Sequence, residues 1–350
     1  MTKKAITAIC IGLLISSCGN DELHDRASIT GDTSHDEQAG SRQITFSPDI
    51  RIGAPAAGTG SNVGALRYSF EDGDKIGLFG VPYTEGVSEA TGMSDITDIP
   101  GFHFFNQPLT YNQADGTLTP DDRLLFMPKD NNMLMYAYYP YNPDGIIYNE
   151  DYGWVLPWSI DVHDLGATPD YMCPSMPVYV YNVNTPVSFG QFNHLFGAVA
   201  FNIYTNDSEI AASAKATEMI LRGAFYEEGL ISLADGRVIM ADDKPTHKFN
   251  IEIPLDANIQ QASSSEEAEP ALAYILSPGS YFASNTKIRI TYNNRIYAFN
   301  MDREDQIEVE AGTIINYNFY LRRTGTRSTE ATQLIIESNT TTQDWNESNQ

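Results

Sequence analysis

Apolar and polar residues alternate along most of this sequence, in short runs that turn residues separate. Between residues 44 and 52, for example, Ile44, Phe46, Ile50 and Ile52 share one phase, and Pro48 interrupts it. Runs of this kind recur about every 8–12 residues, and almost no stretch has a helical period. Because a strand with one buried face has a period of two, the pattern predicts an all-β chain built of β-sandwiches.

Turn residues and one polar segment refine this expectation. Asp115-Gly116 is a hairpin signal, and Asn293-Asn294 joins two alternating runs into a second hairpin. Residues 207–216 are the only segment whose composition suits a helix. We therefore expect strands connected by tight turns, with one short helix.

The length of 350 residues is typical of about two domains. Residues 192–203 are an apolar run that predicts one long strand, and we place the domain boundary just before it. Residues 142–157 are expected to consist mainly of turns. The prediction is one sandwich domain at residues 43–186 and a second at residues 187–323.

The N-terminus has the pattern of a lipoprotein signal peptide. Two lysines precede an apolar run at residues 5–15, and two serines then precede Cys18. A short transmembrane helix is the alternative, but the run is well below the ~20 residues that a span needs. We therefore expect a signal peptide at residues 1–17 and a lipid on Cys18, followed by a disordered tether at residues 18–42.

Composition excludes some partners and some kinds of stabilisation. The chain has 21 Lys and Arg against 46 Asp and Glu, a net charge of −25, so nucleic acid is not an expected partner. Its cysteines are Cys10, Cys18 and Cys173, of which only Cys173 would be free in the mature chain. No intrachain disulfide is then possible, and we expect Cys173 to be a small buried side chain rather than a nucleophile.

The first alternating run has the character of a strand at a sheet edge. Pro48 cannot donate a backbone hydrogen bond, so proline in a strand favours an edge. Residues 53–65 are rich in glycine and alanine and predict a flexible surface loop that ends near Arg67. A trypsin-like cut in such a loop would release the strand.

The sequence contains no recognisable catalytic, cofactor or metal motif, so we expect no enzyme activity and no cofactor. His194 lies in an apolar strand at the expected domain junction. We expect backbone groups to satisfy the hydrogen bonds of its ring, and a catalytic or ligand role is the alternative. Two acidic clusters are expected to be solvated strand ends, although they are candidates for Ca²⁺. They consist of Glu71, Asp72 and Asp74, and of Asp302, Glu304 and Asp305.

The 20 tyrosines raise a further possibility, a platform on which sugars stack. Most lie in alternating strands, where packing in a core or on a sheet face is the ordinary role. Examples of these strand tyrosines are Tyr136, Tyr138, Tyr179, Tyr181, Tyr292 and Tyr317.

Several stretches occur in the order in which the fimbrillin-like lipoproteins, subunits of type V fimbriae of Gram-negative anaerobes, carry similar motifs. The similarity runs along most of the mature chain, with Tyr171 where the family usually has leucine. The stretches are SFEDGDKIGLF (69–79), YAYYPY (136–141), DYM (170–172), FNHLFGAVAFNI (192–203, with His194 and Ala198 in register) and Trp345.

This resemblance implies two tandem transthyretin-like Greek-key β-sandwich domains in a precursor that is lipidated and carried to the outer membrane surface. It also implies that an arginine-specific protease removes the first strand and that a neighbour's C-terminal strand replaces it. The candidate cut sites are Arg51 and Arg67, with Arg42 less suitable because the strand would remain. The removable strand carries Ile44, Phe46, Ile50 and Ile52, and the candidate donor, in the tail at residues 324–350, carries Leu334, Ile335, Ile336 and Trp345.

The expected partners are therefore other fimbrial subunits in a head-to-tail polymer, the outer membrane through the lipid, and receptors on host or bacterial surfaces. A surface glycan-binding lipoprotein of a nutrient-uptake system is the alternative from another class. It requires exposed aromatic residues gathered on one face. A surface hydrolase is a third alternative, for which no reacting group of residues is visible.

Overall fold

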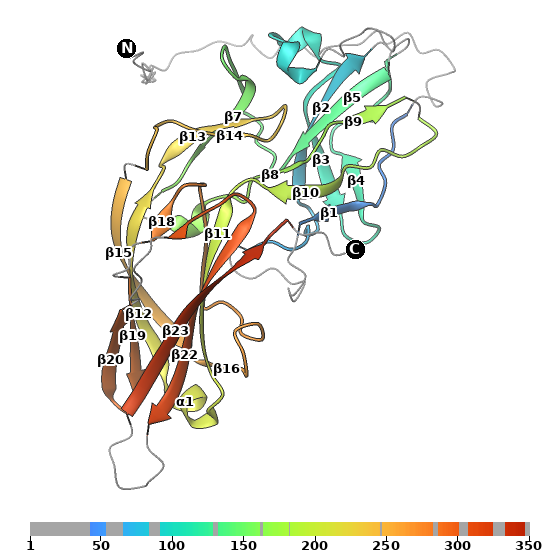
Figure 1. Cartoon of the computed structure of the whole chain (residues 1–350). Coiled ribbons are helices and arrows are strands. Elements are labelled where there is room, and N and C mark those ends of the chain that lie inside the picture. The colour runs from blue at the N-terminus through green and yellow to red at the C-terminus, as the bar shows by residue number, and fades with distance from the viewer. Residues whose placement is uncertain are drawn as a thin grey trace, which may run out of the picture. The chain divides into compact units, whose positions relative to one another are not determined.

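The computed structural model describes the chain from Gln43 onward, with gaps, and strands dominate it (Figure 1). Among the described residues, α1 at Ser208–Ser213 is the only α-helix, inside the segment that the sequence predicts to be helical. Three 3₁₀ turns lie at Met93–Asp95, Ile99–Gly101 and Leu165–Ala167. The described residues are 43–53, 66–83, 92–128, 132–161, 164–181, 183–245, 247–282, 286–300, 307–324 and 333–346.

A five-stranded sheet in the first half of the chain is buried on both faces. In β2, at Lys75–Tyr83, Ile76 and Leu78 pack into one core cluster while Phe79 and Val81 pack into another. This near-continuous apolar strand lies in the middle of the sheet, which has the order β4-β3-β2-β5-β9. The other strands are β3 (Phe104–Asn112), β4 (Thr117–Pro120), β5 (Asn132–Tyr138) and β9 (Val178–Val180).

Each face of this sheet shares a core with a smaller sheet. Three strands in the order β1-β10-β8 contribute Ile50, Ile52 and Phe192 to the cluster that holds Ile76. Four strands in the order β14-β13-β7-β6 contribute to the larger cluster with Phe79. The strands are β1 (Ile50–Ile52), β8 (Met172–Pro174) and β10 (Gly190–His194), and β6 (Ile147–Asn149), β7 (Gly153–Ser159), β13 (Glu228–Ser232) and β14 (Val238–Met240).

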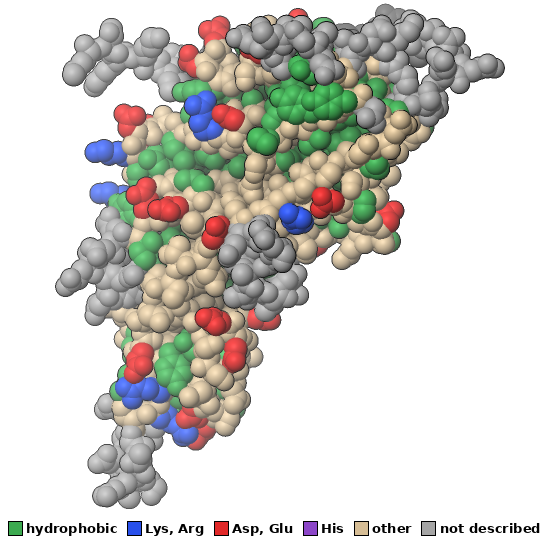
Figure 2. Space-filling view, turned by 45° about the vertical axis from the view of Figure 1, so that its right-hand side comes forward, with side chains coloured by type: hydrophobic (Ala, Val, Ile, Leu, Met, Phe, Trp, Pro, Cys, Tyr) green, Lys and Arg blue, Asp and Glu red, His purple; other side chains and the backbone are tan. Residues whose placement is uncertain are grey.

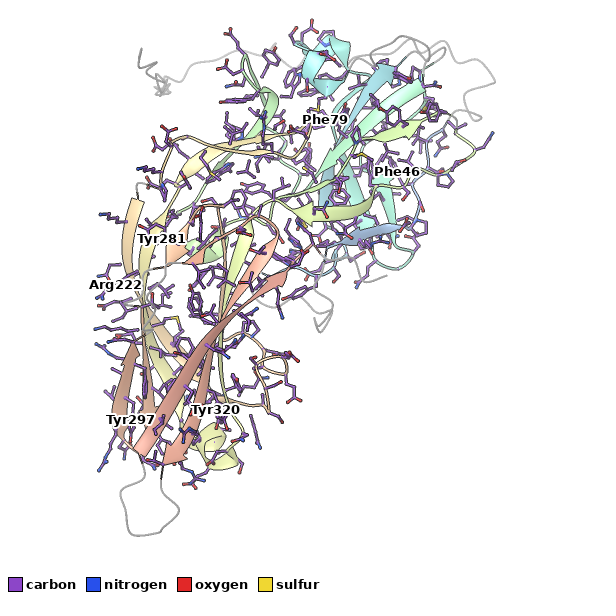
Figure 3. All side chains as sticks on the ribbon, viewed as in Figure 1. Phe46, Phe79, Arg222, Tyr281, Tyr297 and Tyr320 are labelled. Carbon is purple, nitrogen blue, oxygen red and sulfur yellow. The ribbon has the colours of Figure 1, made fainter. Side chains whose placement is uncertain are left out.

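Two further sheets come from the second half of the chain and share the larger core cluster. One has the order β16-β11-β22-β23, with β17 also paired to β11, and the other has the order β20-β19-β12-β18-β21, with β15 also paired to β12. The strands are β11 (Gly197–Thr205), β16 (Gln260–Gln261), β17 (Leu272–Leu276), β22 (Thr313–Thr324), β23 (Gln333–Asp344), β12 (Lys215–Phe225), β15 (His247–Asn258), β18 (Tyr281–Phe282), β19 (Lys287–Tyr292), β20 (Arg295–Asn300) and β21 (Ile307–Glu308). Figure 3 labels Tyr297 on β20 and Tyr320 on β22.

Both predicted hairpins are confirmed. Gly116, with φ of 71°, joins β3 to β4, and Asn293 and Asn294, with φ of 49° and 58°, join β19 to β20. Two residues with positive φ are what a type I′ turn requires, and asparagine tolerates this region better than other side chains.

The expectation of one long strand at residues 192–203 is wrong. β10 ends at His194 and β11 begins at Gly197, so Leu195 and Phe196 separate two strands that belong to different sheets. The chain changes sheets at this point because β10 pairs with β1 and β8, whereas β11 pairs with β17 and β22. The domain boundary placed before residue 187 remains a prediction, and β10 lies on the first-half side of this change.

The expectation that residues 142–157 consist of turns is also wrong in part. They contain β6 and most of β7, which pair with each other across a turn, and β7 pairs in addition with β13. Trp154, Val155 and Leu156 are buried in β7. The glycine, asparagine and proline around them concealed a strand whose inward side chains are large.

Candidate functional site

The first strand, residues 43–53, runs parallel to the segment that leads into β10. Ser47 N donates to Val187 O at 2.8 Å, and Gly53 N donates to Phe192 O at 2.9 Å. β1 is the edge strand of its sheet, in line with the sequence expectation. On the other flank, only the beginning of the first strand is backbone-bonded to another described segment, where Ile44 N donates to Leu125 O at 2.8 Å. Figure 1 shows β1 in blue beside β10.

The apolar side chains of the first strand fill what we call the first-strand slot. Ile44, Phe46, Ile50 and Ile52 are 4%, 7%, 8% and 4% exposed, and all four belong to one core cluster. Phe46, labelled in Figure 3, stacks on Phe189 with ring centroids 6.1 Å apart. Pro48 does not share the buried phase; it is exposed at a bend between the two halves of the strand. Burial of each such side chain contributes about 2 kcal/mol, so the slot supplies much of what holds the strand.

His194 lies at the end of β10 and contacts both the first strand and Asp170. Its Nε2 is 2.9 Å from Gly53 O, and its Nδ1 is 2.9 and 3.0 Å from the two carboxylate oxygens of Asp170. The side chains of His194 and Asp170 are 0% and 3% exposed. Backbone satisfies one ring nitrogen, as expected from the sequence, but the carboxylate partner was not foreseen.

Hydrogen-bond chemistry fixes the proton count of this pair. A carbonyl oxygen only accepts, so Nε2 carries a proton, and a second proton must lie between Nδ1 and Asp170. Burial raises the pKa of the Asp170 carboxyl, while the charge and hydrogen bond of His194, and the charge of Arg67, lower it in part. The pair is thus a buried contact that shares a proton. Removal of either partner would leave the other as an unpaired buried polar group.

The C-terminal end of the chain closes over the same histidine. Trp345 is fully buried, and its indole stacks on the His194 ring at 3.6 Å with an interplanar angle of 11°. The indole Nε1 donates to Arg67 O at 3.1 Å. Asn346 pairs with the His194 backbone in both directions: His194 N donates to Asn346 Oδ1 at 2.7 Å and Asn346 Nδ2 donates to His194 O at 3.2 Å. We call Gly53, Arg67, Asp170, His194, Trp345 and Asn346 the junction cluster.

The tail, here residues 333–346, is a strand of its own sheet. β23 pairs with β22 in antiparallel register from Thr324↔Gln333 to Thr313↔Asp344 and forms the edge of that sheet (Figure 1). Leu334 is buried in the larger core cluster, and Ile335 and Ile336 are half-buried. The apolar residues of the candidate donor are therefore engaged within this chain.

The candidate cut sites differ in their surroundings. The Arg51 side chain is 56% exposed, although its backbone pairs with Gln191 in β10. The Arg67 side chain is 27% exposed, lies 2.9 Å from an Asp74 carboxylate oxygen, and its carbonyl accepts from Trp345. Arg42 and Cys18 lie outside the described residues.

The other residues considered for chemistry have structural surroundings. Cys173 is buried, and burial raises the pKa of its thiol to about 12, so a reactive thiolate is disfavoured. Asp74 bonds Arg67 and accepts from Tyr139 Oη at 3.1 Å. Within the described stretches, no group of three or more His, Cys, Asp or Glu side chains is arranged to hold a metal ion. The second acidic cluster, Asp302, Glu304 and Asp305, lies outside them.

The tyrosines divide into two groups. Tyr136, Tyr138, Tyr292 and Tyr317 are buried. Tyr179 and Tyr181, at the sheet edge formed by β9, are 49% and 54% exposed, and their rings stack at 6.1 Å with an interplanar angle of 10°. Figure 2 shows the hydrophobic side chains of one face concentrated in its upper half, with acidic side chains scattered over the face.

Sequence reasoning identified His194 and Trp345 separately but not their contact. They are far apart in the chain, and Asp170 and Gly53 complete the cluster from two other segments. No spacing in the sequence pairs these residues. Their only common signal is that Asp170, His194 and Trp345 each fall in one of the stretches that resemble family motifs.

Comparisons with known proteins bear on both fold and family. A candidate cell adhesion protein of Bacteroides ovatus is 16% identical with a TM-score of 0.51, over 87% of this chain and 98% of that one. A fimbrial protein of Bacteroides vulgatus is 13% identical with a TM-score of 0.46, over 87% of this chain and 99% of that one. No curated protein sequence matches the chain.

The described part of the chain has no helix with the length and apolar character that a membrane crossing requires. The family model described as fimbrillin-like matches residues 59–345, which includes the five sheets except for β1. The chain therefore belongs to the fimbrillin-like family.

Proposed function

We propose that this protein is a cell-surface fimbrial subunit or accessory adhesin, anchored to the outer membrane by lipid at Cys18. Its fimbrillin-like family membership and its likeness to a cell adhesion protein fold support this role. A net charge of −25 suits an exposed protein that binds other proteins or surfaces rather than nucleic acid. Other fimbrial subunits are its expected partners, with surface receptors as further ones.

Assembly proceeds by removal of the first strand and insertion of a donor strand from another subunit. The observation that carries this step is the first strand itself, which lies at a sheet edge and is held mainly by four side chains in a slot. Its loss exposes an apolar slot and unpaired backbone groups of residues 187–192, at a cost of ~1–3 kcal/mol for each buried group. Strand addition restores these bonds, and repeated head-to-tail addition builds a filament.

The tail of a neighbouring copy is the proposed donor. In the direction of the first strand, Leu334 and Ile336 can occupy the positions of Ile44 and Phe46. Thr340 and Thr342 then fall at the positions of Ile50 and Ile52, where they fill less apolar volume. The fit is therefore partial, because these two threonines leave half of the slot less well filled.

Limited proteolysis with an arginine-specific protease, followed by mass spectrometry and sizing, tests this function. We expect one cut that releases the first strand and oligomers that grow after it. Arg42→Lys, Arg51→Lys and Arg67→Lys keep the charge and identify the cut site, because such a protease does not cleave after lysine. A cut chain that keeps its first strand bound and stays monomeric would contradict strand exchange.

Glycan binding is the second candidate, and the exposed Tyr179–Tyr181 stack favours it. Parallel aromatic faces offer the surface on which sugar rings pack. An affinity gel with soluble protein separates the candidates. If polysaccharide retards the wild type, and Tyr179→Ala/Tyr181→Ala abolishes this while Tyr148→Ala/Tyr152→Ala does not, glycan binding gains support.

A further inference from the structure

The two segments that strand exchange sets in motion meet at one place. Gly53 ends the first strand, and Asn346 follows Trp345 at the end of the tail. A Cβ atom on Gly53 would come within 2.8 Å of Asn346 Cα, so these backbones are in direct contact. Gln191 Nε2, on β10 between them, donates to Asn346 O at 2.6 Å.

His194 touches both segments with its ring. The ring edge donates from Nε2 to Gly53 O, and the ring face stacks on the Trp345 indole. Asp170 holds the opposite edge of the ring through Nδ1. One orientation of the His194 ring thus makes both contacts: the hydrogen bond to Gly53 and the stack on Trp345.

The tail depends on this contact because few of its side chains are buried. Among its side chains at residues 334–346, only Leu334 and Trp345 are buried, one near each end. Between them, Glu337, Ser338 and Asn339 are exposed, as are Thr341 and Thr342. Backbone bonds to β22 hold this middle part, so Trp345 is the side-chain anchor of the C-terminal end.

We propose that His194 couples the first strand to the tail, so that departure of the first strand loosens Trp345 and frees the C-terminal end of β23 from β22. This inference rests on the proposed function, with the cut at Arg67 rather than Arg51, so that Gly53 leaves with the first strand. Departure of Gly53 leaves a buried Nε2–H without its acceptor, and the ring must turn or admit water to satisfy it. Either change removes the face on which Trp345 stacks. Coupling of this kind is reciprocal, so release of the tail also weakens the hold on the first strand.

The consequence concerns the order of assembly. A subunit that still has its first strand keeps its tail docked, and a subunit that has lost it presents a tail that can leave. Separation of β23 from β22 begins at Trp345 and proceeds toward Leu334. Leu334 stays in place longest because it is buried and pairs with Arg323 at the opposite end of the two strands.

Hydrogen–deuterium exchange on the full chain tests the coupling without a protease. Ile50→Asp/Ile52→Asp places two charges in the slot and expels the strand, whereas Thr45→Asp/Pro48→Asp adds the same charges at exposed positions of that strand. We expect exchange at residues 340–346 to accelerate about tenfold or more in the first variant and to stay unchanged in the second. The β19–β20 hairpin serves as the internal reference.

A second pair of variants assigns the coupling to the histidine. His194→Phe/Asp170→Leu keeps an aromatic face and removes both buried polar groups, so expulsion of the first strand should no longer accelerate exchange in the tail. An equal acceleration with and without His194 contradicts the proposal, and so does a tail that never responds.

If a variant does not fold, native-state hydrogen exchange of the unmodified chain in increasing urea tests the coupling instead. The amides of Gly53 and Trp345, which donate to Phe192 O and Gly312 O, should then open with the same free energy and the same urea dependence. Distinct openings overturn the proposal. These exchange experiments measure neither a cut nor a polymer, so a negative result would reject the coupling but not strand exchange. Conversely, a chain that the protease never cuts would reject strand exchange but not the coupling.

Discussion

The first strand and β23 are both edge strands, but different forces hold them. The first strand buries four apolar side chains within nine residues, while its backbone pairs along one flank except at its beginning. β23 pairs with β22 over twelve residues, and Leu334 is the only buried side chain among those described in it, residues 334–344. Side chains therefore hold the first strand, whereas backbone hydrogen bonds hold the tail between its two buried side chains, Leu334 and Trp345.

This difference matches the roles that strand exchange assigns to them. A slot with four apolar pockets selects an occupant by its side chains, so a vacated slot is both costly and specific. A strand whose middle is held by backbone bonds loses little side-chain contact there when it moves to another edge, because the same backbone bonds can form at the new edge. The junction cluster lies where the two kinds of strand meet.

The largest effect is expected from truncation within the slot. Phe46→Ala should lower the free energy of unfolding by about 4 kcal/mol, because it removes a buried ring that stacks on Phe189. Thr342→Ala on the exposed face of β23 should lower it by about 0.5 kcal/mol or less. Urea unfolding measures both, and similar losses would remove the contrast between the two strands.

The junction cluster should rank second. Trp345→Ala should lower the free energy of unfolding by about 3 kcal/mol, since it removes a wholly buried indole and its stack on His194. Hydrogen exchange should show the loss concentrated in the C-terminal part of β23. A uniform loss over all sheets would mean that Trp345 is an ordinary core residue rather than an anchor of the tail.

The fit of the tail to the slot gives a smaller effect of opposite sign. A synthetic peptide of residues 333–346 with Thr340→Ile and Thr342→Ile should bind a vacated slot about tenfold more tightly than the natural peptide, because both positions become apolar. Thr341→Ile, which lies in the outward phase, is the matched control. Equal binding of all three peptides would show that side chains do not select the donor.

A change of pH is expected to alter the free energy of unfolding least. Burial raises the pKa of Asp170, but the charges of His194 and Arg67 offset part of that rise. The pKa of Asp170 is higher in the folded chain than its ordinary value of 3.8. Its contribution to stability is therefore fully present below that value and is lost as pH rises through the folded-state pKa. The difference in unfolding free energy between wild type and Asp170→Asn should move in the variant's favour as pH rises from about 4; movement the other way contradicts a raised Asp170 pKa in the folded chain.

Local patterns predicted much of the fold. The alternation at residues 44–52, the two hairpin turns and the helix at residues 207–216 depend on neighbours in sequence, and the structure contains them all. The break at Leu195 and Phe196 was not predictable, because an apolar run has no signal for a change of sheet. β6 and β7 were missed because glycine, asparagine and proline lie within and beside them, and pairing with β13 stabilises β7 in spite of this.

The candidate site was predictable only in its parts. Its first strand was visible from Pro48 and the apolar phase, and Trp345 and His194 stood out individually. Their assembly depends on contacts between segments far apart in sequence, such as Gly53 with His194 and Arg67 with Trp345. Such contacts follow from the packing of sheets, which no local pattern records.

Exchange of the first strand for a free peptide shows most directly whether this strand is replaceable. A protease site inserted within residues 54–65 allows the folded chain to be cut without relying on a natural site. A fluorescent peptide of residues 43–53 is then mixed with cut and uncut protein, at urea concentrations at which both stay folded. We expect fluorescence anisotropy to rise with the cut protein only, and a peptide carrying Ile50→Asp not to bind. A cut protein that retains its own strand and takes up no peptide would contradict the claim that the first strand is replaceable.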